Sequence, residues 1–160
     1  MEKHNEIIWE ILTNSKVGML VTSDDENKEL SARPMHLVQD DYRGILWFYT
    51  NYDSEKVEES LKDQVCVTFT DSKNGGYVSL TGSASIHKDK ALIDRFWNPM
   101  IAAWFPEGKN DPQVSILRID VNFGEYWKNN KSFIGTAFEM SKSVIQGKMP
   151  DLGDNQKFNH

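Results

Sequence analysis

Short apolar stretches separated by polar turns run through most of the chain and predict a protein built mainly from β-strands. Strands are predicted over residues 17–22, 30–38, 45–50, 65–70, 77–87, 114–121 and 123–128. Pro34 lies inside the second stretch and indicates an edge strand or a bulge, because proline cannot donate a ladder hydrogen bond.

Apolar residues recur every three or four positions in several of the other segments, which is the spacing of a helix. Helices are predicted over residues 3–14, 89–97, 99–105 and 133–146, with a short one that begins after Asp53 or Ser54 and ends near Leu61. Strands and helices do not alternate strictly, so the pattern favours a mostly antiparallel barrel with helices around it. We expect one domain over residues 1–149, followed by a polar, mobile tail over 150–160.

Composition narrows the class of protein. The 160 residues carry a net charge of −6, which disfavours a nucleic-acid partner because backbone binding needs a basic face. The single Cys66 excludes an internal disulfide and a Cys-rich metal site. No apolar run approaches the length of a membrane span. We therefore expect a cytoplasmic protein without a membrane partner.

The common catalytic and metal-binding motifs are absent from the sequence. It contains no P-loop, no dinucleotide-binding glycine motif and no zinc-protease motif. The four histidines, His4, His36, His87 and His160, lack ligand spacing, so no metal site is expected. Cys66 lies in an apolar strand and is interpreted as a small buried hydrophobe rather than a nucleophile.

The segment from Thr50 to Lys56 passes from a strand end into a helix start. Backbone N–H groups at a helix start favour an anion, and the Ser54 hydroxyl and the Lys56 ammonium lie in the same turn. These groups are the parts of a phosphate site. The alternative is a capped helix with a solvated lysine.

Arg33 lies among apolar neighbours on the preceding strand, where an arginine usually has an anion partner. If the second and third strands form a hairpin, Arg33 and Lys56 can share one phosphate, with Arg33 making the bidentate contacts. The alternative is a salt bridge from Arg33 to a glutamate such as Glu55.

Four motifs together resemble the FMN-binding split-barrel superfamily, which includes pyridoxamine 5′-phosphate oxidase. They are residues 31–35 (S-A-R-P-M), 47–56 (W-F-Y-T-N-x-x-S-x-K), 78–83 (V-S-L-T-G-S) and 125–127 (E-Y-W). The resemblance covers about residues 3–130 and is nearest to the general stress protein 26-like branch. It implies a six-stranded antiparallel Greek-key split barrel and a homodimer with two FMN sites at its interface; FAD is the alternative cofactor.

The resemblance also assigns roles to residues of this chain. It implies that Arg33, Ser54 and Lys56 bind the FMN phosphate and that Met35 and His36 approach the flavin ring. Phe48, Tyr49, Thr50 and Asn51 would line the flavin and its ribityl chain. Trp127, and the stretch from Trp97 to Trp104, would come from the partner subunit. The alternative for these tryptophans is core or dimer packing, and no catalytic residue is assigned.

Departures from the oxidase pattern disfavour vitamin B6 oxidation. The chain has Glu55 and Val38 where that oxidase has basic residues, and Lys128 to Phe133 and Ala137 where it has two substrate arginines. A phosphorylated vitamin needs such paired cations. Two hypotheses follow: a stress-related FMN-dependent oxidoreductase with NADH or NADPH as candidate donor, or a non-catalytic flavin store or sensor. Haem is disfavoured for lack of an axial histidine, and deazaflavin is an outside option.

Overall fold

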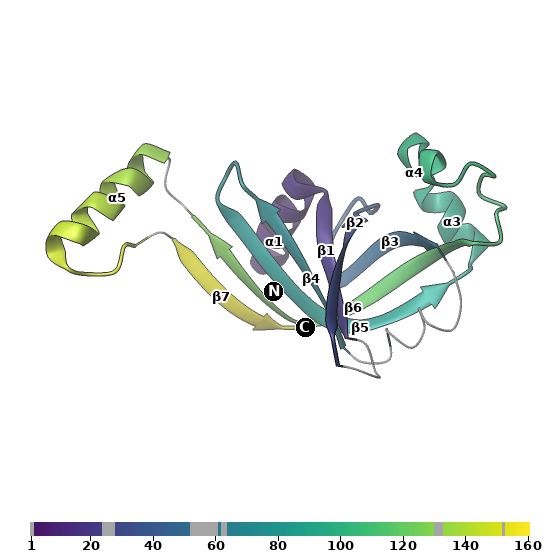
Figure 1. Ribbon diagram of the computed structural model, residues 1–160, viewed down its shortest axis with the longest axis horizontal. Coiled ribbons are helices and arrows are strands. Elements are labelled where there is room, and N and C mark those ends of the chain that lie inside the picture. The colour runs from purple at the N-terminus through teal and green to yellow at the C-terminus, as the bar shows by residue number, and fades with distance from the viewer. Residues whose placement is uncertain (1, 24–27, 52–60, 62–63, 130–132, 152) are drawn as a thin grey trace.

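The computed structural model describes the chain except residues 1, 24–27, 52–60, 62–63, 130–132 and 152. Its described residues form one antiparallel sheet with helices around it (Figure 1). The strands are β1 (Val17–Ser23), β2 (Leu30–His36), β3 (Ile45–Asn51), β4 (Gln64–Asp71), β5 (Gly76–His87), β6 (Val114–Lys128) and β7 (Asp154–Asn159). The helices are α1 (Glu2–Ser15), α3 (Lys90–Phe96), α4 (Pro99–Trp104) and α5 (Phe133–Gln146). The predicted short helix before Leu61 falls outside the described residues.

The strand order is β2-β1-β4-β5-β6-β3, with β7 added on β6. Strands β4, β5 and β6 are consecutive antiparallel neighbours, and the earlier strand β3 returns to pair with β6, which is a Greek-key arrangement. The two ends of the path, β2 and β3, meet only at an isolated bridge between Leu37 and Phe48. The prediction of a mainly antiparallel, split-barrel-like fold with peripheral helices is confirmed, and the sheet stays open between β2 and β3.

The side chain of Gln39 continues the junction beyond that bridge. Its amide nitrogen donates to the carbonyl oxygens of Asp41 and Ile45, at 2.6 and 2.8 Å. Its amide oxygen accepts from the backbone N–H of Trp47 at 2.8 Å. One side chain thus takes the place of a strand neighbour for β3 on the loop side of the bridge.

Helix α1 fills the interior of the curved sheet. Its apolar face buries Ile8, Ile11 and Leu12 against the inner side of β4 and β5. Phe48 of β3 is fully buried in the same core and stacks on Phe69 of β4, with ring centroids 6.5 Å apart.

A second core lies on the outer side of β3 and β6, beneath α3 and α4. Successive side chains of a strand point to opposite faces, so Tyr49 faces these helices while Phe48 faces the interior. The second core is formed by Tyr49, Ile93, Phe96, Ile101, Phe105, Val114 and Ile116. Asp89 and Asn98 cap the two helices through hydrogen bonds to backbone N–H groups. These caps fix the helices beside the end of β3.

The two strands predicted over residues 114–121 and 123–128 form one long strand, β6. The interruption is a bulge: Thr81 pairs with Phe123 and Gly82 with Val121, so one residue of β6 has no partner in β5. At this point a Cβ on Gly82 would lie only 2.1 Å from the carbonyl oxygen of Asp120. Glycine is therefore required where the strands cross so closely.

The C-terminal segment differs from the mobile tail expected over residues 150–160. Residues 154–159 form β7, which pairs antiparallel with β6 from Phe123 to Lys128. Phe158, the one apolar side chain of β7, is half-buried against the main core, over Gly124. A strand with a single apolar residue has no alternation, so its sequence pattern gave no signal.

Candidate functional site

Two adjacent cavities of about 280 and 230 Å³ lie where β2 and β3 separate. The larger is lined by Pro34, Met35, His36, Tyr49, Thr50, Asn51, Ile101, Trp104 and Phe105. The smaller is lined by Leu20, Arg33, Met35, Thr50, Asn51, Leu61 and Leu117. Met35, Thr50 and Asn51 line both cavities. The site is therefore one groove with two compartments, located at the opening of the sheet.

Arg33 defines the charge of the smaller compartment. It lies on β2 opposite Leu20 of β1, and its Nη2 donates to the hydroxyl of Thr22 at 3.0 Å. Thr22 is buried, so its hydroxyl is a fixed anchor for the guanidinium. Arg33 is the only formally charged residue among the described residues that line the groove. This end of the groove suits an anion.

The alternative partner for Arg33, Glu55, falls outside the described residues. Within the described part of the chain, none of the ion pairs involves Arg33. The Thr22 hydroxyl is neutral, so this contact orients the guanidinium without neutralising its charge.

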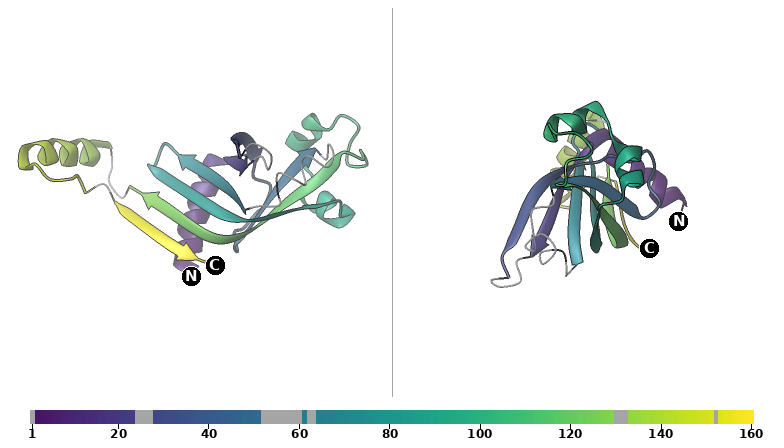
Figure 2. Two further views of the ribbon diagram at one scale, coloured as in Figure 1. Left: turned by 60° about the horizontal axis from the view of Figure 1, so that its bottom comes forward. Right: turned by 90° about the vertical axis from the view of Figure 1, so that its right-hand side faces the viewer.

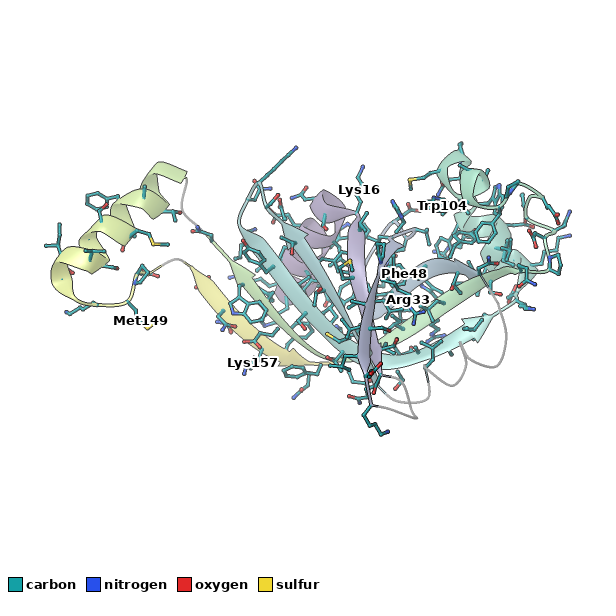
Figure 3. The ribbon with its side chains drawn as sticks, in the orientation of Figure 1. Lys16, Arg33, Phe48, Trp104, Met149 and Lys157 are labelled. Carbon is teal, nitrogen blue, oxygen red and sulfur yellow. The ribbon has the colours of Figure 1, made fainter. Side chains whose placement is uncertain are left out.

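The larger compartment has aromatic walls. Tyr49 comes from β3, and Trp104 and Phe105 come from the end of α4. The indole of Trp104 is 68% exposed, and its ring lies 6.5 Å from the imidazole of His36. Figure 3 shows Trp104 and Arg33 on opposite sides of the β2–β3 region. Flat apolar walls of this kind suit a planar ring system.

Tyr49 fixes the aromatic wall to α3. Its hydroxyl donates to the carbonyl oxygen of Ile93 at 2.5 Å. Burial, reinforced by the negative charge of Asp94, raises the pKa of Tyr49 to about 12. The phenol therefore keeps its proton at neutral pH and acts as a structural donor.

The predicted site residues divide into three groups. Those that line the groove are Arg33, Met35, His36, Tyr49, Thr50 and Asn51. Ser54 and Lys56 lie outside the described residues. Phe48, Trp97 and Trp127 are described by the structure but line neither compartment of the groove.

Phe48 is buried in the main core and lines neither cavity, because strand alternation turns it inward. Trp97 packs edge-on against Tyr49, with ring centroids 5.8 Å apart, so within this chain it supports the aromatic wall from behind. Trp127 lies on β6 opposite Tyr77, outside the groove.

Ile101 and Trp104 belong to the stretch 97–104 that the resemblance assigned to the partner subunit, and they line the groove of their own chain. Phe105, which also lines the groove, was not singled out from the sequence. Thr22 was missed as the anchor of Arg33. The strand register could have identified Thr22, because it lies directly opposite Ser31, two residues before Arg33 on β2.

The described residues hold neither a candidate metal site nor a membrane-spanning helix. No group of three or more His, Cys, Asp or Glu side chains within the described part of the chain is placed to hold a metal ion. None of the described helices combines the length and apolar character needed to cross a bilayer.

An open antiparallel barrel with a cationic and an aromatic compartment at its split defines a class of small-molecule binding domains. A family model described as pyridoxamine 5′-phosphate oxidase like matches residues 3–151 of this chain. The chain belongs to this family.

Individual relatives agree with this assignment. The chain is 31% identical to the protein bli-3 of Neurospora crassa over 147 residues, which cover 86% of this chain and 70% of the relative. A putative general stress protein 26 from Jannaschia sp. CCS1 shares the fold with a TM-score of 0.77 at 23% identity, over all of both chains. The general stress FMN/FAD binding protein from Xanthomonas citri is 31% identical with a TM-score of 0.71, over 83% of this chain and 94% of that one. The sequence-based recognition of the family is confirmed.

Proposed function

We propose that this chain is a flavin-binding protein that holds FMN in the groove between β2 and β3. The observation that carries the proposal is Arg33, the one formal charge among the described groove residues, set beside an aromatic compartment. The Xanthomonas citri relative is named as an FMN/FAD binding protein, which supports a flavin as the ligand.

The residues of the groove fit the two ends of FMN. Arg33, oriented by the Thr22 hydroxyl, would bind the phosphate through charge-assisted hydrogen bonds. The ring would lie in the aromatic compartment, where Tyr49, Trp104 and Phe105 exclude water from its face. The polar side chains of Thr50 and Asn51 line both compartments and would face the ribityl hydroxyls. The proposal names FMN rather than FAD because the described groove residues include one formal positive charge, Arg33, which suits one phosphate group.

The proposed activity is a stress-related oxidoreduction. Bound flavin supplies hydride and electron transfer, and the protein supplies orientation and a dry site. Tyr49 holds its proton and bonds to Ile93, so it does not exchange protons with a substrate. Among the described groove residues, His36 has ring nitrogens that can donate a hydrogen bond to a ligand or accept one from it. NADH or NADPH is the proposed donor.

A second copy of the chain completes the proposed protein as a homodimer with flavin at the interface. Trp127 lies outside this chain's own groove and is exposed, so it is available to contact the groove of a second copy. Trp97 is already packed against Tyr49 and Phe105 and keeps its packing role in the proposal.

The test of the proposal is FMN retention by Arg33→Ala. Purified protein is incubated with FMN and desalted, its visible absorption spectrum is recorded, and FMN and riboflavin affinities are measured by titration. The wild-type chain should retain a two-band flavin spectrum. Arg33→Ala should weaken FMN roughly 10- to 100-fold, because a hydrogen bond to a charged group contributes about 1.5–3 kcal/mol. Riboflavin lacks the phosphate and should bind both proteins equally.

Arg43→Ala is the matched control, since Arg43 is exposed, pairs with Asp41 and does not line the groove. Its FMN affinity should equal that of the wild type. Unchanged FMN affinity in Arg33→Ala would overturn the phosphate site. If FMN binds but neither NADH nor NADPH reduces it in stopped-flow mixing, the chain is the non-catalytic store or sensor instead.

A further inference from the structure

Helix α4 presents an uncharged apolar surface at the edge of the larger compartment. Its residues, 99–104 (P-M-I-A-A-W), include no charged side chain. Ile101 is buried, whereas Met100 is 48% exposed and Trp104 is 68% exposed. Met100 and Trp104 are four residues apart, so they lie on the same side of the helix. A surface helix normally turns polar side chains to solvent, so this side of α4 has the composition of a binding surface.

Trp104 differs from the other aromatic walls of the larger compartment. Tyr49 and Phe105 are buried, whereas most of the Trp104 indole remains accessible. Among the described residues, its one aromatic neighbour is His36, whose ring is tilted by 45° at a centroid distance of 6.5 Å. A ring that fills the compartment therefore leaves part of the indole open to a second ligand.

The backbone that carries Trp104 is fixed on both sides. The side-chain oxygen of Asn98 accepts hydrogen bonds from the backbone N–H groups of Met100 and Ile101, at 3.0 and 3.1 Å. Ile101 and Phe105 are anchored in the second core beside β3. An aromatic side chain on a fixed backbone loses little entropy when a ligand stacks on it.

His36 adds a polar group to this surface. Within the described part of the chain, its imidazole makes no hydrogen bond of its own. A neutral imidazole offers one N–H donor and one acceptor nitrogen. The neighbouring Pro34, which lines the same compartment, has no N–H to offer. We call His36, Met100 and Trp104 together the rim.

We propose that the rim binds the ring of a second reactant, and that this ring is flat, uncharged and carries a carbonyl oxygen at its edge, as a quinone does. Trp104 stacks on the ring, and the His36 N–H donates to the oxygen. The inference rests on the proposed function and names the class of its electron acceptor.

The charges of the groove favour an uncharged ring over an anionic one. Arg33 lines the smaller compartment and not the larger one, and the proposed function already assigns it to the FMN phosphate. None of the described residues that line the larger compartment carries a formal charge. A carboxylate or phosphate on the reactant would lose its water at the rim without gaining a cation.

The chemistry of a quinone balances with the proposed donor. Reduction of a quinone to its hydroquinone takes two electrons and two protons. NADH or NADPH supplies both electrons and one proton, and solvent supplies the other proton. Bound flavin carries such transfers, so the rim itself has only to bind and orient the ring.

The test is equilibrium dialysis of FMN-loaded protein against three probes, which measures binding and not turnover. Duroquinone is uncharged and fully substituted, so it does not alkylate Cys66. Durene is the corresponding ring without the carbonyl oxygens, and benzenesulfonate carries a negative charge. The wild type should bind duroquinone most tightly and benzenesulfonate most weakly.

Two variants separate the stacking contact from the hydrogen bond, each loaded at an FMN concentration that saturates it. Trp104→Ala should weaken duroquinone and durene alike, roughly 2- to 10-fold, because both lose an aromatic contact. His36→Phe keeps a ring but removes the nitrogens, so it should weaken duroquinone roughly 2- to 10-fold and leave durene unchanged.

Phe138→Ala is the matched control. Phe138 is 68% exposed, like Trp104, but it lies on α5. Figures 1 and 2 show α5 at the opposite end of the molecule from α4. The control should therefore bind all three probes as the wild type does.

Several results would overturn the inference. A wild type that retains FMN but does not bind duroquinone would overturn it and leave the proposed function standing. Trp104→Ala with wild-type affinity, benzenesulfonate bound as tightly as durene, or equal losses of duroquinone and durene in His36→Phe would each contradict it as well. A wild type that does not retain FMN would overturn the proposed function and this inference with it.

Sedimentation equilibrium of the same samples tests a second copy of the chain as the occupant of the rim. If Trp104→Ala raises the dimer dissociation constant and leaves duroquinone binding unchanged, the rim contacts the second copy and the inference is wrong. The inference expects the reverse: weaker duroquinone binding at an unchanged dimer dissociation constant.

Discussion

At the scale of single residues, the candidate site depends on side chains that are fixed by neutral partners. Arg33 is held by the buried hydroxyl of Thr22, and Tyr49 by the carbonyl oxygen of Ile93. Neither contact neutralises charge: the Thr22 hydroxyl sets the direction of the Arg33 guanidinium and adds no opposite charge. Such prior positioning lowers the entropy that binding must overcome.

The pKa of Tyr49 predicts an alkaline loss of stability. Its pKa is raised from 10 to about 12 in the folded chain, mainly by burial. A group with a raised folded pKa contributes stability that is fully present below its unfolded pKa and lost as the pH rises through the folded pKa. The wild-type chain should therefore lose free energy of unfolding between pH 10 and about 12, and Tyr49→Phe should lose less over the same range.

Urea denaturation at neutral and alkaline pH measures the free energy of unfolding of both proteins, and so tests the alkaline loss and the cost of removing the hydroxyl. At neutral pH, Tyr49→Phe should unfold more easily by about 1–3 kcal/mol, because the carbonyl of Ile93 loses its hydrogen bond. An equal alkaline loss in both proteins would show that Tyr49 is not a source of it.

Residue patterns predicted the location of the site better than the direction of each side chain. Arg33, Met35, His36, Tyr49, Thr50 and Asn51 were predicted from the sequence, and all six line the groove; Pro34, which was not among the predicted site residues, lines it too. Phe48 was included, although alternation along β3 turns it into the core. Thr22 and Phe105 contribute through strand register and helix packing, which depend on pairings distant in sequence.

At the scale of elements, the edge of the sheet differs most from prediction. The bulge in β6 and the added strand β7 both arise from contacts between segments far apart in the chain. The local pattern of β7 is polar, so only its pairing with β6 makes it a strand. By contrast, α1 and β1 to β5 were predicted within a few residues, because their apolar periodicity reflects burial directly.

The packing of β7 on β6 predicts a strong size limit at Gly124. A Cβ at this position would lie 2.1 Å from the ring of Phe158 and 2.9 Å from the side chain of Leu80. Gly124→Ala should therefore displace Phe158 and lower the free energy of unfolding by about 1–3 kcal/mol, as overpacked sites do.

A double-mutant cycle identifies the cause. In a Phe158→Ala background the ring is gone, so Gly124→Ala should cost clearly less than in the wild type. Chemical denaturation of the four proteins gives the coupling energy. Equal costs in both backgrounds would mean that Phe158 does not limit this position.

At the scale of the whole molecule, the open side of the sheet and the uncovered surfaces belong to different parts of the fold. The groove lies between β2 and β3, whereas the exposed aromatic residues Tyr77 and Trp127 lie on β5 and β6, and the exposed Val144 and Ile145 lie on α5. Figure 3 shows Met149, 93% exposed, far from Arg33 and Trp104. In the proposed dimer, Trp127 would therefore reach the groove of a second copy from a surface that is not part of its own groove.

The proposed dimer with flavin at its interface predicts a thermodynamic coupling between the two. If a second copy supplies Trp127 to the groove, FMN binds the dimer more tightly than the monomer. By linkage, FMN then tightens the dimer by the same factor. Saturating FMN should lower the dimer dissociation constant by roughly 5- to 150-fold, the range of typical couplings. Sedimentation equilibrium with and without FMN measures this factor. Trp127→Ala should reduce the factor. The control Trp47→Ala should leave it unchanged, because Trp47 is packed beneath α3. A dissociation constant that FMN leaves unchanged would place the flavin within one chain, away from the interface.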